Sequence, residues 1–105
     1  MGARAFSKTI PVNTTASAVI ALSQVTSWAI RENASTAAAA TVLLRRGTST
    51  GAVLIPIEIN ANGSDHAEYD TPVDFSTDNN GTPVAGQVVF VDVAAGTVEG
   101  TVSGY

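Results

Sequence analysis

The sequence predicts an all-β fold: a single antiparallel β-sandwich or barrel of about six to eight short strands, with an N-terminal arm. Three observations support this prediction. Apolar and polar residues alternate with a period of two in several runs, Ala, Val, Thr, Gly, Ser and Asn dominate the composition, and turn-forming pairs such as Asn62-Gly63 and Asn80-Gly81 separate the runs. The chain has 105 residues, enough for one domain. We expect residues 1–15 to form the arm and residues 16–105 the β-sandwich domain.

The N-terminal arm, MGARAFSKTIPV, combines basic residues with one aromatic residue. Arg4 and Lys8 flank Phe6, outside the predicted core. An apolar side chain between two positive charges suits a segment that docks onto another chain, for example by adding a strand to a neighbouring sheet. Arg4, Phe6 and Lys8 are therefore the candidate partner-binding residues.

The next two predicted strands are VTSWAIREN and TVLLRR. In the first, Trp28 and Ile30 share a face, which predicts a core position for Trp28, with an interface anchor as the alternative. The stretch STAAAATVLLRR fits a helix capped by Ser35 as well as a strand. We prefer a strand from about Ala39 or Ala40, because Thr41 and Val42 are β-branched and the following strand begins within reach of a hairpin.

The clearest strand is AVLIPIEIN, which begins at Ala52. Its alternation predicts that four residues face one side, and these are Val53, Ile55, Ile57 and Ile59. Pro56 cannot donate a hydrogen bond to a neighbouring strand, so this strand is expected at a sheet edge or at a bulge. Near the C-terminus, QVVFVDV and GTVEGTV alternate in the same way around Gly96, which predicts a hairpin with a tight turn.

The segment GTSTG at residues 47–51 fits the G-x-S-x-G pattern of a nucleophilic serine. A nucleophile elbow needs a helix after the serine, whereas the best predicted strand follows Ser49 here. The only histidine, His66, comes too soon after Ser49 for the usual intervening elements. The segment therefore predicts a hairpin loop, and we expect no catalytic residues and no enzyme activity.

Other kinds of site receive little support. His66 lies in GSDHAEYD among Asp65, Glu68 and Asp70, where either a divalent-cation site or a solvated acidic loop fits, and we prefer the loop. The chain has no cysteine, and its glycines stand singly at turns without a nucleotide-binding pattern. We expect no metal, no cofactor and no small-molecule substrate.

Charge is sparse and unevenly distributed. Charged residues make up 13% of the chain, the net charge is −4, all five basic residues precede residue 47, and eight of the nine acidic residues lie from Glu58 onward. Folding could mix the two halves, or the asymmetry could serve contacts between copies or with a partner. The acidic balance disfavours nucleic acid, and a surface this poor in charge suggests extensive contact with partners. No segment is apolar enough for a membrane span or a signal peptide, so we expect synthesis in the cytoplasm and no membrane partner.

Three segments together resemble a known group of proteins: VTSWAIREN, TVLLRRGTSTGAVLIPIEINANGS and GQVVFVDVAAGTVEGTVSGY. Over residues from about 25 to 105, the chain is similar to small β-rich structural proteins of tailed bacteriophages, particularly of actinobacterial hosts, and most of all to capsid decoration or cement proteins. The resemblance implies a non-enzymatic protein on the outer surface of the virion capsid. It also implies binding to the major capsid protein, reinforcement of capsomer junctions, and a homo-oligomer, with a trimer favoured.

Two alternatives remain. The first is another virion component of the tail, neck or fibre, which composition does not distinguish from a decoration protein. The second is a carbohydrate-binding β-sandwich module, which usually presents exposed aromatic residues. The aromatic residues are Phe6, Trp28, Tyr69, Phe75, Phe90 and Tyr105. We expect Trp28 and Phe90 to be buried, which leaves few aromatic residues for a sugar-binding platform.

Overall fold

The computed structural model describes residues 6–14, 17–77 and 88–105. These residues form eight strands and no helix. The strands are β1 (Phe6–Thr14), β2 (Ala18–Ile20), β3 (Gln24–Glu32), β4 (Ala40–Arg46), β5 (Val53–Ile59), β6 (Ser64–Asp74), β7 (Val89–Ala95) and β8 (Val98–Gly104). Among the described residues there is accordingly no helix of the length and apolarity that crossing a membrane requires.

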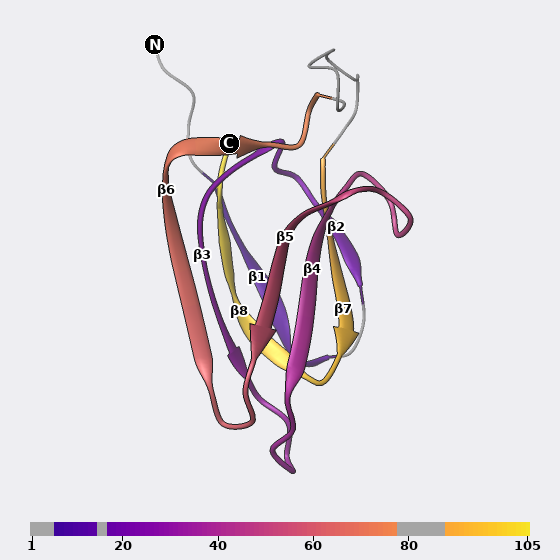
Figure 1. Ribbon diagram of the computed structural model, residues 1–105, viewed down its shortest axis with the longest axis vertical. Helices are drawn as coiled ribbons and strands as arrows, with labels where there is room; N and C mark the ends of the chain where they lie inside the picture. The colour runs from indigo at the N-terminus through magenta and orange to yellow at the C-terminus, as the bar shows by residue number, and fades with distance from the viewer. Residues whose placement is uncertain (1–5, 15–16, 78–87) are drawn as a thin grey trace.

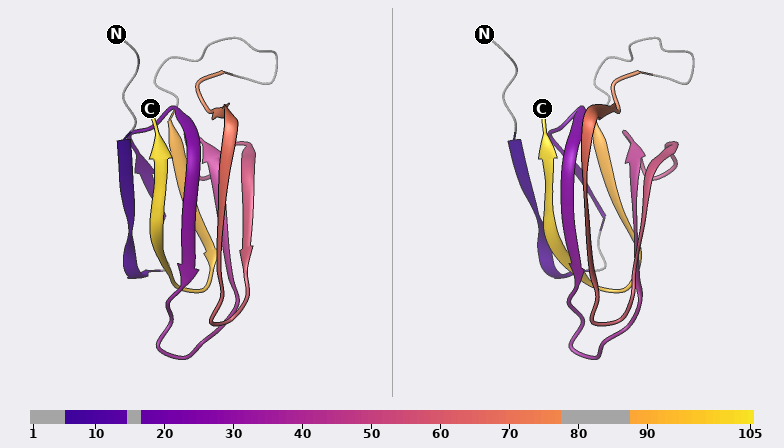
Figure 2. Two further views of the ribbon diagram at one scale, coloured as in Figure 1. Left: turned by 90° about the vertical axis from the view of Figure 1, so that its left-hand side faces the viewer. Right: turned by 60° about the vertical axis from the view of Figure 1, so that its left-hand side comes forward.

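The strands form two antiparallel sheets that lie face to face (Figure 1). The first sheet, called sheet A, has the strand order β1-β8-β3-β6, and the second, sheet B, has the order β2-β7-β4-β5. The left view of Figure 2 shows sheet A in front with sheet B behind it. The predicted all-β antiparallel sandwich is confirmed.

The pairing of the strands is nested. Strand β4 pairs with β5, β3 with β6, β2 with β7, and β1 with β8, so the first half of the chain pairs with the second half in reverse order. Two further ladders, β3 with β8 and β4 with β7, join neighbouring pairs within each sheet. This arrangement, a long hairpin wrapped into two four-stranded sheets, is the jelly roll.

The core lies between the sheets and consists almost entirely of aliphatic side chains. Alternate residues of the central strands point into the core, so buried and partly exposed residues alternate along β4 and β7. The buried apolar residues are Leu22, Val25, Trp28, Ile30, Ala40, Val42, Leu44, Ile55, Ile57, Ile59, Phe75, Val89, Val91, Val93, Val98 and Val102. The core position predicted for Trp28 is confirmed, and its indole Nε1–H donates a hydrogen bond to the Tyr69 hydroxyl at 2.9 Å.

A bulge changes the face of one predicted core residue. Leu44 pairs with Ile55 but Arg45 pairs with Val53, so Leu54 is an extra residue in β5. Since successive side chains of a strand point to opposite faces, one extra residue turns Val53 away from the core. The prediction that Val53 shares the core face of Ile55 is wrong, because Val53 is 39% exposed. The expectation for Pro56 is confirmed, since β5 is the edge strand of sheet B.

The predicted C-terminal hairpin is also wrong. Strands β7 and β8 are correctly located, but they belong to different sheets and do not pair with each other. Gly96, with φ of +80°, makes the turn that carries the chain across, and a Cβ there would lie 2.7 Å from the Ala40 Cβ. The turn at Asn62, with φ of 59°, likewise connects β5 in sheet B to β6 in sheet A.

Two segments expected outside the sheets form strands. Residues 6–14 of the predicted arm form β1, which pairs with β8 from Phe6 opposite Gly104 to Thr14 opposite Val98. The acidic stretch expected as a loop forms β6, the other edge strand of sheet A. An edge strand tolerates exposed charged side chains, because only one of its sides is hydrogen-bonded to a neighbour. Other expected elements are confirmed: β3, β4 from Ala40, and a loop over GTSTG.

Because side chains alternate along β4, replacing two neighbouring leucines should lower the free energy of unfolding by very different amounts. Leu44 is fully buried, and we expect Leu44→Ala to lower the free energy of unfolding by about 2–5 kcal/mol through loss of buried surface and a cavity. Leu43 is partly exposed on the outer face, and Leu43→Ala should cost no more than about 1 kcal/mol. Urea unfolding followed by circular dichroism measures both values, and equal losses would contradict the assignment of faces.

Candidate interaction surfaces

The sequence-predicted partner-binding residues occupy the N-terminal end of the chain. Arg4 lies outside the described residues. Phe6 and Lys8 belong to β1, where their backbones pair with Gly104 and Val102 of β8 in the same chain. The structure therefore places two of the three residues at one edge of sheet A.

The outer face of sheet B carries the exposed large apolar side chains of the described residues. Val19 of β2 and Val53 of β5 are its most exposed large apolar side chains, at 57% and 39%. Leu43 and Phe90 are partly exposed on the same face, and Pro56 is exposed beside Leu43. Phe90, expected to be buried, points outward because its neighbours Val89 and Val91 point into the core.

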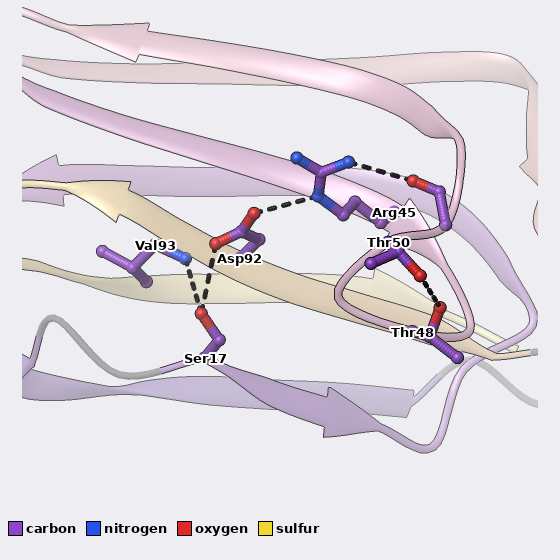
Figure 3. A network of polar contacts seen from close by, with 7 residues as sticks. Ser17, Arg45, Thr48, Thr50, Asp92 and Val93 are labelled. Atoms are coloured by element: carbon purple, nitrogen blue, oxygen red, sulfur yellow. Dashed lines mark hydrogen bonds and ion pairs between the residues drawn. The ribbon is translucent and has the colours of Figure 1, made fainter.

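A polar network crosses this apolar face (Figure 3). Arg45 Nε donates to Asp92 Oδ2 at 2.9 Å, and Arg45 Nη1 donates to the carbonyl oxygen of Gly51 at 3.0 Å. The Ser17 hydroxyl donates to Asp92 Oδ1 at 3.2 Å and accepts a hydrogen bond from the Val93 N–H. The Arg45 and Asp92 side chains are only 22% and 21% exposed, so both charges lie low in the surface and neutralise each other.

The outer face of sheet A differs in chemistry. Its β3 residues Ser27, Ala29 and Arg31 pair with Ser103, Thr101 and Glu99 of β8, and with Glu68, His66 and Ser64 of β6. Arg31 forms an ion pair with Glu99. Two shallow hollows, both lined by Ala29 and His66, lie on this face. Apart from Glu68 and His66 on the edge strand β6, the face is therefore built from small and hydroxyl-bearing side chains and the Arg31–Glu99 pair.

Acidic side chains collect where the edges of the two sheets meet. Strands β5 and β6 are connected by a short turn and present the exposed residues Glu58, Asp65, Glu68 and Asp70. Within the described residues, no group of three or more His, Asp or Glu side chains is placed to hold a metal ion. His66 lies in β6, on the outer face of sheet A, whereas Ser49 lies in the loop between β4 and β5.

A buried carboxylate fixes the loops at one end of the sandwich, the lower end in Figure 1. Glu32 is 8% exposed, and its carboxylate accepts backbone hydrogen bonds from Asn62 at 2.8 Å and Ala34 at 2.5 Å. These hydrogen bonds, that from Asn62 first, hold the pKa of Glu32 below its ordinary value although burial acts in the opposite direction. Glu32 thus joins the β3–β4 connection to the β5–β6 turn.

Asp74 has a similar role at the opposite end, where β6 finishes. Its carboxylate accepts hydrogen bonds from the Ser76 hydroxyl at 2.5 Å and the Ser76 N–H at 2.8 Å. The Ser76 hydroxyl is the largest cause of the lowered pKa of Asp74, and the positive charge of Arg46 contributes in the same direction. Asp74 therefore fixes the start of the connection that follows β6.

The aromatic residues give no exposed platform among the side chains described. Trp28 and Phe75 are buried, and Tyr69, Phe90 and Tyr105 are partly buried. The side chain of Phe6 lies outside the described part of the chain. Within these limits the structure shows no cluster of exposed rings of the kind that sugar-binding modules use.

Sequence reasoning missed the apolar face of sheet B. Nothing in ASAVIALS distinguishes a three-residue edge strand with an exposed valine, and strict alternation placed Val53 on the same face as Ile55. A usable signal was the alternation of QVVFVDV, because Val89, Val91 and Val93 on the core face require Phe90 on the other.

Replacing Glu32 tests its role in fixing the loops. Because folding lowers the pKa of Glu32, its stabilising effect is complete above the ordinary value of 4.5 and is lost as the pH falls through the lower pKa of the folded state. We expect Glu32→Gln to lower the melting temperature at pH 7, and the difference from the parent protein to shrink as the pH is lowered below 4.5. Thermal unfolding at a series of pH values measures this.

Glu58→Gln is the matched control, because it removes the same charge from an exposed carboxylate on β5, a strand of the other sheet. A pH-independent difference for Glu32→Gln, or an equal loss for Glu58→Gln, would contradict the assigned role.

Comparison of the chain with models of known protein families, with characterised proteins and with solved structures found no match.

Proposed function

We propose that this chain is a non-enzymatic structural protein of a tailed-phage virion, which binds the outer surface of the capsid and stabilises the junctions between capsomers. Its partner in this proposal is the major capsid protein, and its location is the capsid surface. The starting point is the resemblance carried by the segments VTSWAIREN, TVLLRRGTSTGAVLIPIEINANGS and GQVVFVDVAAGTVEGTVSGY.

The observation that carries the proposal is that an arginine on each outer sheet face already has an acidic partner, while the exposed acidic residues Glu58 and Glu68 lie on the edge strands β5 and β6. Arg31 pairs with Glu99 on sheet A, and Arg45 pairs with Asp92 on sheet B. The centres of protein–protein interfaces are depleted of charged residues, and covering a charge that already has its partner leaves no isolated charge in the interface. Both faces are therefore suited to contact with another protein.

The fold supports the proposal by analogy only. Jelly rolls occur in viral capsid proteins and also in lectins, and the same fold serves many unrelated functions. The described aromatic residues are buried or partly buried, which gives no specific support to the lectin-like alternative. A location in the tail, neck or fibre of the virion would use the same kinds of contact. The experiment below distinguishes that alternative from binding to the capsid.

The proposed mechanism is mechanical. Two packed sheets form a rigid body whose strands pair across almost the whole length of the chain. Such a body resists deformation when it bridges two capsomers, and many copies make modest individual contacts effective. No chemical step is required of any side chain.

Binding to purified phage heads tests this proposal. We expect the protein to bind heads that lack it until a fixed number of copies per head is reached, and to raise the temperature at which packaged DNA is released. Sedimentation measures the copies bound, and a DNA-binding dye measures release. Heads that already carry their full complement serve as the control and should bind no more. Unsaturable binding, or binding to isolated tails but not to heads, would overturn the proposal.

A further inference from the structure

The two most exposed large apolar residues of the described chain stand in a simple geometric relation. Val19 pairs with Phe90, Phe90 pairs with Arg45, and Arg45 pairs with Val53. The four residues therefore form one row across the outer face of sheet B, with the exposed valines at its two ends. Adjacent strands lie about 4.8 Å apart, so the row spans about 14 Å.

A row with this arrangement is complementary to a copy of itself. Consider a twofold axis parallel to the strands that passes above the centre of the row, between β7 and β4. Rotation about this axis places each end of the row over the opposite end in the second molecule. Val19 of each copy then faces Val53 of the other, and Phe90 of each copy faces Arg45 of the other, a favourable combination of aromatic ring and cation.

We infer that a second copy of this chain packs face to face on the outer face of sheet B, with Val19 of each copy against Val53 of the other. The contact joins two sheets, as in the aligned packing of a β-sandwich. It gives a twofold dimer, which differs from the trimer that the phage resemblance implies. The inference goes beyond the proposed function and does not depend on it.

The charges of the molecule favour this face for contact between identical chains. On sheet B the Arg45–Asp92 pair is already formed and is mostly covered in the single chain, so a second copy buries no unpaired charge in the row. The edge formed by β5 and β6 carries the exposed acidic residues Glu58, Asp65, Glu68 and Asp70. Two copies that met through that edge would bring like charges together, whereas the Thr41–Glu58 pair is four residue pairs away from the Val19–Val53 row along sheet B.

The size of the face sets the expected strength. Four strands about 14 Å across and at most seven residues, about 23 Å, long give a flat area of no more than about 330 Å² per copy, because β2 has only three residues. Stable interfaces usually bury about 800 Å² per partner, so this dimer should be weak and depend on concentration. A high local concentration, such as many copies on one surface, would favour it.

Cysteine cross-linking tests the arrangement directly, because the chain contains no cysteine. V19C and V53C are purified separately and mixed, the mixture is treated with a short bifunctional maleimide because sheets packed face to face lie about 10 Å apart, and the products are separated by denaturing electrophoresis. We expect covalent dimers in the mixture and few in either variant alone, since like positions lie about 14 Å apart across the interface. A bifunctional reagent is needed because a direct disulfide requires Cα atoms within about 7 Å, which is less than the separation of packed sheets.

A matched control uses T101C, whose parent residue is exposed on the outer face of sheet A. Mixed with V19C it should give no more dimer than either variant alone. Circular dichroism establishes that every variant is folded. If the V19C and V53C mixture cross-links no better than this control, or if V19C alone cross-links as well as the mixture, the inference is overturned.

Introducing opposite charges on the two sides of the contact provides a second test without cross-linking. In sedimentation velocity the parent protein should show an average mass that rises with concentration toward that of a dimer. V19D and V53K should each weaken association about tenfold or more, and the V19D/V53K double variant should recover it, because each introduced carboxylate then faces an introduced amine of the other copy. A monomer at all concentrations, or an oligomer that is insensitive to both single variants, would overturn the inference.

Discussion

The nested antiparallel pairing of the two halves of the chain is the constraint on which the rest of this structure depends. The β4–β5 hairpin is the innermost pair, and each outer pair, up to β1 with β8, encloses the pairs before it. Every strand of the first half therefore has a hydrogen-bonded partner in the second half. Because most of these partners are far apart in sequence, the fold gains its stability mainly from long-range contacts, which are typical of slowly folding β proteins.

The same pairing explains what becomes of the uneven charge distribution. All the basic residues lie in the first half of the sequence and all the acidic residues except Glu32 lie in the second, and nested pairing places the halves beside each other. Arg31 of β3 meets Glu99 of β8, and Arg45 of β4 meets Asp92 of β7. Both ion pairs form within one chain, so these two arginines do not have to find an acidic partner elsewhere. Among the described residues, the exposed acidic side chains that have no basic partner lie on β5 and β6, the two strands that follow the innermost turn of the nested pairing.

Local patterns predicted the strands better than their partners. Alternation located β3, β4, β5, β7 and β8, and Pro56 correctly indicated an edge strand. The alternation did not reveal that the turn at Gly96 connects the two sheets. A tight turn has the same sequence pattern whether the strands on either side of it pair with each other or belong to different sheets. Strands β2 and β6 were missed because an edge strand with exposed residues lacks the apolar alternation that identifies a strand with one buried face.

The candidate contact surface depends on a local irregularity that sequence alternation hides. If Leu54 paired regularly with Arg45, Val53 would continue the inward series of Ile55, Ile57 and Ile59, and the outer row of sheet B would lose one apolar end. The bulge lies next to the loop that joins β4 to β5, where Arg45 also binds the Gly51 carbonyl oxygen. Bulges commonly redirect a side chain at a functional position, and here the redirected side chain completes a row whose two ends match. The bulge that ends regular pairing near the hairpin loop is thus also the feature that makes this face self-complementary.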